Sequence, residues 1–387
     1  MDKSRRETLN VDVLVIGAGP AGGTSSLLLA RSGLNVLIVD SKKSIGKRSC
    51  SGILGYKCLE ELPVNPEPFV VSEIKSGTFE SPGGAKIRVE GNIAKVVDRV
   101  ALDKEIIDEA ISYGAKIRTG CRFIGIENGK AITWGKNGLD AISFKYLVGA
   151  DGVYSKVRDL MGLEIENPYI GVQAFSQEKE VSEEFIVRIK EGSRFSWVYP
   201  WGKRNRAGVL GRKTDPVMEW IKEANSSLEE MFVAAIPSKP LRSFHKGNIA
   251  LVGDAAGQVK PLSRGGVYLG VTGAKLLSRS IIESYEKGSS DIEKRYETEW
   301  WRLFGFEVKA GLALRKVLDS MNSKALDSLF ASLEAQEMRI SPFDIDRQFT
   351  SIIKRINKLD LLRVVLHTPK LFLRFLTAFM VSYVSYF

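Results

Sequence analysis

The chain has 387 residues, of which 44% are hydrophobic and 26% are charged. This composition predicts a folded protein with two domains, or with a cofactor domain through which a substrate domain is threaded, and it excludes a long disordered tail. The net charge of +10 is dispersed, and its densest group, Lys203, Arg204 and Arg206, is expected in a turn. Contact with an acidic membrane surface or a phosphorylated substrate is therefore favoured over nucleic-acid binding.

The three cysteines, Cys50, Cys58 and Cys121, form no Cys-x-x-Cys pair. A standard zinc site or an iron–sulfur cluster built by this chain alone is thus excluded, and no metal site is predicted. Three thiols also give no disulfide framework, which indicates a reducing compartment.

A strand, a glycine turn, a helix and a second strand are predicted between Val11 and Asp40. The apolar run 11–16 is typical of a buried parallel strand, and Gly17-Ala18-Gly19-Pro20-Ala21-Gly22 follows it. The three glycines of Gly-x-Gly-x-x-Gly allow a tight turn, close approach of a pyrophosphate, and packing of the helix on the strand. Asp40 can accept a hydrogen bond from a ribose hydroxyl, so the unit predicts a dinucleotide site.

The rest of the chain alternates between strand and helix patterns. Strands are expected within 63–89, 172–211 and 249–252, helices over 98–110 and from 266 onward, and a strand, turn and helix start over 147–158. We therefore predict the α/β class (α+β overall), with a Rossmann-like cofactor domain, an inserted antiparallel sheet and a helical C-terminal region. The expected bounds are 1–62, 90–165 and 245–285 for the cofactor domain, 63–89 and 166–244 for the sheet domain, and 286–387 for the helical region.

Two further glycine motifs follow apolar strands. The first is Gly149-Ala150-Asp151-Gly152, which continues to Ser155 and Arg158, and the second is Gly253-Asp254-Ala255-Ala256-Gly257, with Pro261 and Gly265-Gly266 downstream. Asp254, directly after the strand over 249–252, can bind ribityl hydroxyls with its carboxylate. The helix expected from 266 onward would direct its N-terminus at a flavin ring. Taken singly, each motif is also typical of a glycine turn capped by aspartate.

The three motifs in this order resemble the FAD-binding family that includes aromatic hydroxylases, halogenases and geranylgeranyl reductases. The resemblance covers roughly residues 11–275 and implies FAD and a para-hydroxybenzoate-hydroxylase-like fold. Arg99, at the start of the helix over 98–110, matches the family's arginine that contacts the cofactor. The residues expected to bind FAD are Gly17, Gly19, Pro20, Ala21, Gly22, Asp40, Ser41, Arg99, Asp151, Gly152, Gly253, Asp254, Gly257, Pro261, Gly265 and Gly266.

Two segments are similar to the geranylgeranyl reductase branch. Ser49-Cys50-Ser51-Gly52 is similar to its Cys-Gly-Gly loop, with Ser51 in place of a glycine, and Phe195-x-Trp197-x-Tyr199-Pro200 is similar to its Tyr-x-Trp-x-Phe-Pro signature. In a strand the three aromatic residues share one face, which predicts either a lining for a prenyl chain or the core of the sheet. The segments 299–305 and 312–315 are also similar to this branch's C-terminal helices.

The branch implies reduction of isoprenoid double bonds in a membrane lipid or a prenyl precursor, and so a role in lipid biosynthesis and phospholipid metabolism. Such a site supplies a hydride and a proton, excludes water, and stabilises cationic character with aromatic faces. We expect Cys50, Trp197 and Tyr199 to be catalytic and Phe195, Trp197 and Tyr199 to contact the substrate. Cys50 is the candidate proton donor, while His245 is expected to be structural.

The C-terminal residues 371–387 are apolar except for Arg374 and small hydroxylated residues. As a helix they would be roughly 26 Å long, less than the about 30 Å of a bilayer core. An interfacial helix is favoured over a span, and a helix packed on the substrate domain is the alternative. The protein is accordingly expected at the cytoplasmic side of a membrane, as a peripheral protein.

Two other functions stay open. A flavin monooxygenase or halogenase is one, because residues 195–200 are also similar to the halogenase signature Trp-x-Trp-x-Ile-Pro. A lipid-binding protein that merely retains FAD is the other. The expected partners are a prenyl lipid and an external electron donor, which is either NAD(P)H or a ferredoxin-like protein.

Overall fold

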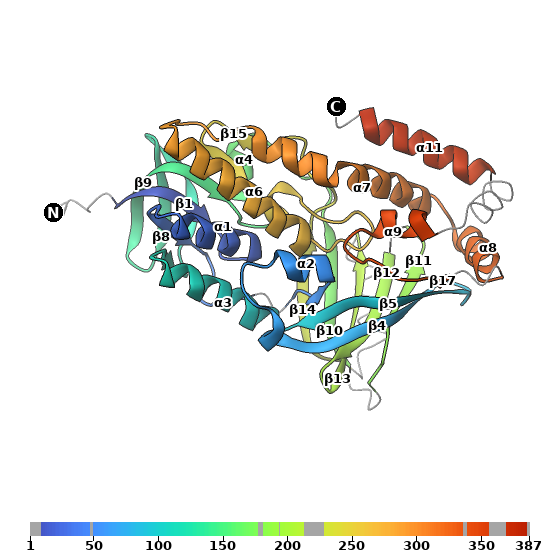
Figure 1. The fold of residues 1–387 in the computed structure, drawn as a ribbon. Helices are drawn as coiled ribbons and strands as arrows, with labels where there is room; N and C mark the ends of the chain where they lie inside the picture. The colour runs from blue at the N-terminus through green and yellow to red at the C-terminus, as the bar shows by residue number, and fades with distance from the viewer. Residues whose placement is uncertain are drawn as a thin grey trace.

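The structure of the protein is a computed structural model. It describes residues 9–46, 49–176, 181–192, 194–212, 228–335, 339–355 and 369–384. Within these ranges two sheets lie side by side, each with its own hydrophobic core. Long helices run along both sheets on one side of the molecule (Figure 1).

The first sheet has the strand order β15-β16-β9-β1-β2-β6, with β8 paired to β9 and β7 paired to β8. The bounds are β1 Leu9–Ile16, β2 Val36–Val39, β6 Lys116–Arg118, β7 Arg122–Glu127, β8 Lys130–Gly135, β9 Gly138–Gly149, β15 His245–Lys246 and β16 Ile249–Leu251. β1 runs parallel to both β2 and β9, and β9 runs parallel to β16. The carboxyl ends of these strands therefore meet at one edge, where nucleotides bind in such sheets.

Helices cover this sheet and begin at that edge. α1 (Pro20–Arg31) follows β1, α3 (Arg99–Ser112) packs beside α1, and α6 (Val267–Glu286) packs against α1 from the C-terminal half of the chain. A short α4 (Lys156–Leu160) follows β9, and a 3-10 turn η2 (Gly253–Ala256) follows β16. The three glycine motifs are thus brought together because each lies directly after a parallel strand.

The second sheet has the order β14-β10-β13-β12-β11-β4-β5-β17, with β3 paired to β5. The bounds are β3 Ile53–Leu54, β4 Val70–Glu80, β5 Lys86–Val97, β10 Tyr169–Ser176, β11 Phe185–Lys190, β12 Arg194–Trp201, β13 Arg204–Gly211, β14 Leu228–Ile236 and β17 Arg339–Ile340. A short α2 (Tyr56–Glu61) and a 3-10 turn η1 (Glu67–Phe69) lie between β3 and β4.

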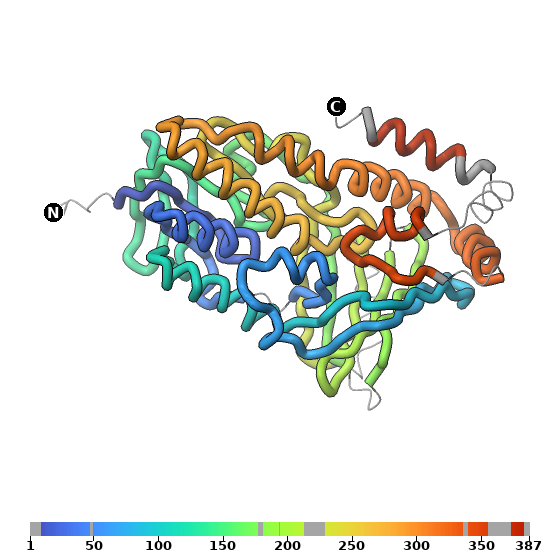
Figure 2. The backbone as a smooth tube through the Cα atoms, in the orientation of Figure 1, coloured from blue at the N-terminus to red at the C-terminus, as the bar shows by residue number. Residues whose placement is uncertain are grey.

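The C-terminal helices complete the fold. α7 (Arg295–Asp319) runs beside α6, α8 (Ser323–Glu334) packs near β5, and α9 (Gln348–Arg355) lies against α7. α11 (Pro369–Val384) packs along α7. Figure 2 shows the described part of the chain that begins with β17 beside the second sheet, where β17 pairs with β5.

The expected elements are present, with informative differences. The helix expected over 98–110 is α3, and Asp98 caps it by accepting hydrogen bonds from the backbone N–H groups of Val100 and Ala101. The expectation of a turn around Arg204 and Arg206 is wrong, because both lie in β13 and only Lys203 is in the turn. The domain bounds remain a prediction, but the second sheet differs from them: β5 continues to Val97, and β3 and β17 also belong to it.

No helix in the described ranges is long and apolar enough to cross a membrane.

Candidate flavin and substrate site

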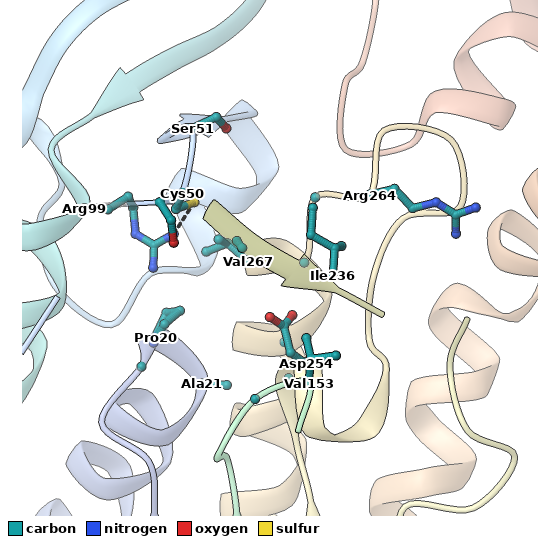
Figure 3. A pocket seen from close by; sticks show the side chains of 18 of the residues that line it. Pro20, Ala21, Cys50, Ser51, Arg99, Val153, Ile236, Asp254, Arg264 and Val267 are labelled. Atoms are coloured by element: carbon teal, nitrogen blue, oxygen red, sulfur yellow. Dashed lines mark hydrogen bonds between the residues drawn. The ribbon is translucent and has the colours of Figure 1, made fainter. Parts of the chain in front are cut away.

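A cavity of about 1050 Å³ lies between the two sheets. All three glycine motifs and the loop around Cys50 contribute to its wall (Figure 3). The aromatic strand β12 lines the cavity as well. The predicted residues that line it are Gly17, Gly19, Pro20, Ala21, Asp40, Ser41, Cys50, Arg99, Asp151, Gly152, Phe195, Trp197, Tyr199, Gly253, Asp254, Gly265 and Gly266.

Three predicted cofactor residues lie behind this wall instead. A Cβ on Gly22 would meet the carbonyl oxygen of Gly17 at 2.0 Å, so Gly22 lets α1 approach the turn. Gly257 has φ +69°, and a Cβ there would meet the carbonyl oxygen of Lys239 at 2.2 Å. Pro261 packs against Gly311 of α7. All three shape the site from outside the cavity.

The first glycine turn is a cradle open on one side. Gly17 has φ +107°, and a Cβ there would meet the carbonyl oxygen of Ala150 at 2.3 Å. By contrast, a Cβ on Gly19 would meet no atom of the described chain within 4 Å. Gly19 is the N-cap of α1 and has no side chain that could cap the helix. The first helical N–H groups, which begin at Ala21 because Pro20 has none, are therefore left for a ligand. This geometry fits the pyrophosphate of a dinucleotide.

Asp40 directly follows β2, beside this cradle. Its carboxylate accepts hydrogen bonds from the backbone N–H groups of Ala18 (2.7 Å) and Lys42 (2.8 Å). These bonds fix the carboxylate at the cavity wall, and each oxygen retains a further lone pair. The position fits a ribose hydroxyl as donor.

The second and third motifs are tied to each other. Asp151 accepts hydrogen bonds from the Ser155 hydroxyl and the Lys156 N–H, and burial raises the pKa of its carboxyl group. Arg158 donates to the carbonyl oxygens of Val153 and Ala255 and so joins α4 to η2. Gly266 is the N-cap of α6, and a Cβ there would lie 2.9 Å from the Asp254 carboxylate. Glycine at this position therefore leaves room for the carboxylate beside the start of α6.

A buried ion pair stands next to Cys50. Arg99 and Asp103, one helical turn apart on α3, are 3% and 1% exposed, and Arg99 Nη2 lies 2.7 Å from the carboxylate. Burial lowers the pKa of Arg99, but the Asp103 carboxylate outweighs this effect and raises it. Arg99 Nη1 also donates to the Cys50 sulfur at 2.9 Å (Figure 3). A guanidinium only donates, so the thiol proton is left to point elsewhere.

The Cys50 loop is held on the second sheet by polar contacts. The Tyr199 hydroxyl donates to the carbonyl oxygen of Ser51 at 2.8 Å, and Arg206 Nη1 donates to that of Cys50 at 3.1 Å. Tyr199 is fully buried, which raises the pKa of its phenol. Arg206 is also buried, with its guanidinium 4.3 Å from the ring centroid of Trp201.

Phe195, Trp197 and Tyr199 share one face of β12, as predicted from strand alternation. Trp197 lies over Gly208 of the neighbouring strand, where a Cβ would meet the indole ring at 2.3 Å. All three residues line the cavity, and Tyr199 also belongs to the core of the second sheet. The face thus contributes both to the cavity wall and to the sheet core. That it lines the path of a prenyl chain stays a prediction.

Several cavity residues were missed from the sequence. Gln173 on β10 lies 3.3 Å from the Tyr199 hydroxyl, and Lys260 donates to the carbonyl oxygen of Ile345 and pairs with Asp346 at 3.3 Å. The sequence could have predicted Asp103, because it lies one helical turn after Arg99, and an acidic and a basic residue at this spacing form ion pairs. The others come from distant segments and leave no local signal.

His245, expected to be structural, lies away from the cavity wall. Its ring Nδ1 is 3.1 Å from Glu297 of α7, which also accepts from the Ser243 hydroxyl and the Phe244 N–H. This network joins β15 to α7.

Known proteins resemble the chain along most of its length. The family described as "FAD binding domain" matches residues 10–63. A protein of Methanococcus aeolicus named digeranylgeranylglycerophospholipid reductase is 27% identical, with 89% of this chain and 95% of that protein covered. An uncharacterized protein of Methanocaldococcus jannaschii is 30% identical, with 90% and 96% covered.

Among solved structures, a geranylgeranyl bacteriochlorophyll reductase-like protein of Thermoplasma acidophilum has the same fold. Its TM-score is 0.79 at 19% identity, with 94% of this chain and 100% of that one covered. Together with the cavity and its glycine cradle, these likenesses identify the cofactor as FAD. The chain belongs to the geranylgeranyl reductase family of FAD-dependent oxidoreductases.

Proposed function

We propose that this oxidoreductase saturates the isoprenoid double bonds of a membrane lipid or a prenyl precursor, as the name of the Methanococcus relative suggests. One observation supports this more than any other. A single cavity runs from the glycine cradle to Cys50 and on to the aromatic face of β12. Such a cavity can hold a flavin at one side and a long apolar chain at the other.

In this proposal the cavity-lining residues of the three glycine motifs hold FAD. The Gly19 turn and the start of α1 would bind the pyrophosphate, Asp40 the adenosine ribose, and Asp254 the ribityl hydroxyls. The first N–H groups of α6 would stabilise negative charge on the flavin ring. When bound and reduced, FAD supplies the hydride of the reaction.

The remaining proton would come from Cys50. Because Arg99 donates to the sulfur, the orientation of the thiol is fixed while its proton is free to reach the cavity. Tyr199 is the alternative donor, although its hydroxyl proton is engaged by the carbonyl oxygen of Ser51. Trp197 and Phe195 would stabilise cationic character on the alkene with their ring faces.

Replacing Cys50 with alanine is expected to lower prenyl reduction by roughly 10²-fold or more and to leave FAD retention unchanged, because a general acid is lost and the pyrophosphate cradle is not touched. Single-turnover flavin oxidation by a prenyl substrate measures the first effect, and flavin absorbance after gel filtration measures the second. Cys50→Ser, which keeps a hydroxyl proton, should recover part of the rate. Wild-type turnover by Cys50→Ala would make Cys50 a packing residue and leave Tyr199 or water as the donor.

Anaerobic oxidation of the reduced flavin separates the competing functions. A prenyl reductase is oxidised by the prenyl lipid without oxygen, whereas a monooxygenase or halogenase requires oxygen. A lipid-binding protein that merely retains FAD would not be oxidised by the lipid at all.

The electron donor is proposed to be a ferredoxin-like protein rather than NAD(P)H, since the sequence has one dinucleotide fingerprint and FAD uses it. Fast anaerobic bleaching of the flavin by NADPH would contradict this choice.

We further propose peripheral contact with the cytoplasmic face of a membrane through α7 and α11. Apolar side chains stay exposed there although the two helices pack together. They are Leu303, Phe306, Leu373, Leu376, Met380 and Val381. Exposed apolar side chains on two neighbouring helices, in a chain with net charge +10, suit an anionic bilayer surface.

The variant Leu373→Glu/Met380→Glu is expected to bind anionic vesicles at least about tenfold more weakly, because two apolar side chains no longer enter the interface and two negative charges face the lipid. Co-sedimentation with vesicles measures this. Leu139→Glu, at an exposed apolar residue on β9, is the control and should bind like wild type. Equal binding by wild type, the double variant and the control would mean that Leu373 and Met380 do not contact the membrane.

A further inference from the structure

Lys260 is a buried cation on the cavity wall, and the proposed function gives it no role. It lies in the loop between η2 and α6 and is 7% exposed. Its side chain crosses Gly265, where a Cβ would meet Lys260 Cε at 3.0 Å and Nζ at 3.5 Å. The Lys260 N–H donates to the carbonyl oxygen of Gly265, which closes the loop. Because Gly265 directly precedes the N-cap of α6, the ammonium group lies beside the start of that helix.

The ammonium group of Lys260 keeps one donor for a ligand. Nζ donates to the carbonyl oxygen of Ile345 at 2.9 Å and to the Asp346 carboxylate at 3.3 Å. An ammonium group carries three N–H donors, and within the described ranges the third has no acceptor. A buried donor without an acceptor costs free energy. Since Lys260 lines the cavity, a bound ligand can supply the missing acceptor there.

A buried carboxylate compensates this charge. Among the described residues, Asp346 is the carboxylate that pairs with Lys260. Asp346 is 1% exposed and also accepts a hydrogen bond from the Cys58 N–H at 2.9 Å. Gly55 makes room for it, because a Cβ there would meet the carboxylate at 2.2 Å. Asp346 belongs to the segment 339–349, whose strand β17 pairs with β5. The counter-charge thus comes from a segment outside the three glycine motifs.

The place of this ion pair matters for a flavin. In the proposed function the first N–H groups of α6 face the flavin ring, and Lys260 adds a full positive charge at the same end of that helix. Reduction of FAD by two electrons, with uptake of one proton, leaves one negative charge that the oxidised ring lacks. A cation beside the ring therefore stabilises reduced FAD more than oxidised FAD and raises the reduction potential. A carboxylate at the same place has the opposite effect.

We propose that Lys260 and Asp346 set the reduction potential of the bound FAD. Lys260 donates its third N–H to an acceptor of the ring and raises the potential, while Asp346, a positioning residue that acts through Lys260, orients this N–H and limits the rise. The inference rests on the proposed function for the place of the flavin ring, and on the geometry of the ion pair for the sign of each effect. The pair thereby determines how strong a reductant the electron donor must be.

The test measures the midpoint potential of the FAD-loaded protein at equilibrium with a reference dye, without a prenyl substrate. Lys260→Gln should disfavour reduced FAD by roughly tenfold to hundredfold, which lowers the potential of this two-electron couple by about 30–60 mV. Lys260→Arg keeps the charge and should retain most of the wild-type potential. Asp346→Asn should favour reduced FAD by up to roughly tenfold, a rise of about 30 mV. Lys287→Gln, at the exposed far end of α6, is the matched control and should have the wild-type potential.

Affinities separate this effect from damage to the site. Titration of the apoprotein with oxidised FAD, followed by flavin fluorescence, gives one dissociation constant, and the potential then gives the constant for reduced FAD. Lys260→Gln should weaken binding of reduced FAD and leave binding of oxidised FAD little changed. A merely structural defect would weaken both forms alike and leave the potential where it is in wild type.

FAD content and the unfolding midpoint show which variants are folded. If Lys260→Gln does not fold, because Asp346 is left buried without its partner, Lys260→Gln/Asp346→Asn is compared with Asp346→Asn. The double variant should have the lower potential, since the two differ by the Lys260 charge alone. Equal potentials in that pair, or a wild-type potential in folded Lys260→Gln, overturn the proposal. Predicted potentials in a protein that reduces no prenyl lipid would overturn the proposed reaction alone.

Discussion

Replacing Gly19 with valine is expected to abolish FAD retention without unfolding the protein. Gly19 is the one glycine of the first motif whose Cβ would enter open space, and its backbone has an ordinary φ of −76°. The valine side chain would therefore be accommodated by the fold and would occupy the place of the pyrophosphate. Flavin absorbance per protein after gel filtration measures retention, and circular dichroism measures folding.

The contrast with other glycines makes this prediction specific. Valine at Gly17 or Gly22 would clash with backbone atoms, so loss of FAD there would report misfolding rather than a blocked site. Gly125 on β7 also faces open space and lies outside the cavity wall, so Gly125→Val is the matched control and should retain FAD. Full FAD occupancy in Gly19→Val would refute the assignment of this turn to the pyrophosphate.

The second large effect is expected on stability. Asp103→Asn should lower the free energy of unfolding by about 3–5 kcal/mol, because Arg99 would be left buried without the charge that compensates it. Unfolding in urea, followed by circular dichroism and with FAD at a fixed saturating concentration, measures the change. Loss of the ion pair should also release Arg99 from the orientation in which it contacts Cys50.

The same helix supplies the control. Lys104 and Asp108 form a pair with the same spacing, and both side chains are largely exposed. Asp108→Asn should therefore change stability by less than about 1 kcal/mol. If the two variants were equally stable, burial of the Arg99–Asp103 pair would have no energetic consequence. The double variant Arg99→Met/Asp103→Leu, which removes both charges, should recover much of the stability.

The parts of the fold that follow local rules could be predicted from the sequence. β1, α1 and β2 follow from an apolar run, a glycine turn and a second apolar run, and α3 from its Asp98 cap. The shared face of Phe195, Trp197 and Tyr199 follows from strand alternation. Each of these depends on neighbours within a few residues, which a single sequence contains.

The parts of the fold that depend on pairing between distant segments could not be predicted from the sequence. The sequence predicts Arg206 in a turn, yet its strand pairs with β10 and β12, and its guanidinium is buried against aromatic rings. Lys260 forms an ion pair with Asp346, which lies in a segment far along the chain. Arg264 is likewise buried and donates to Ser238 and Tyr169 of other segments, and no local pattern distinguishes it from a surface arginine.

Mass spectrometry of the prenyl lipid tests the central claim most directly. A geranylgeranyl lipid is incubated with the FAD-loaded protein and dithionite, without oxygen, and its mass is compared with that of a sample lacking protein. The account predicts a gain of about two mass units for each double bond that receives a hydride and a proton. An unchanged lipid mass, with the flavin fully reduced and the lipid bound, would contradict it.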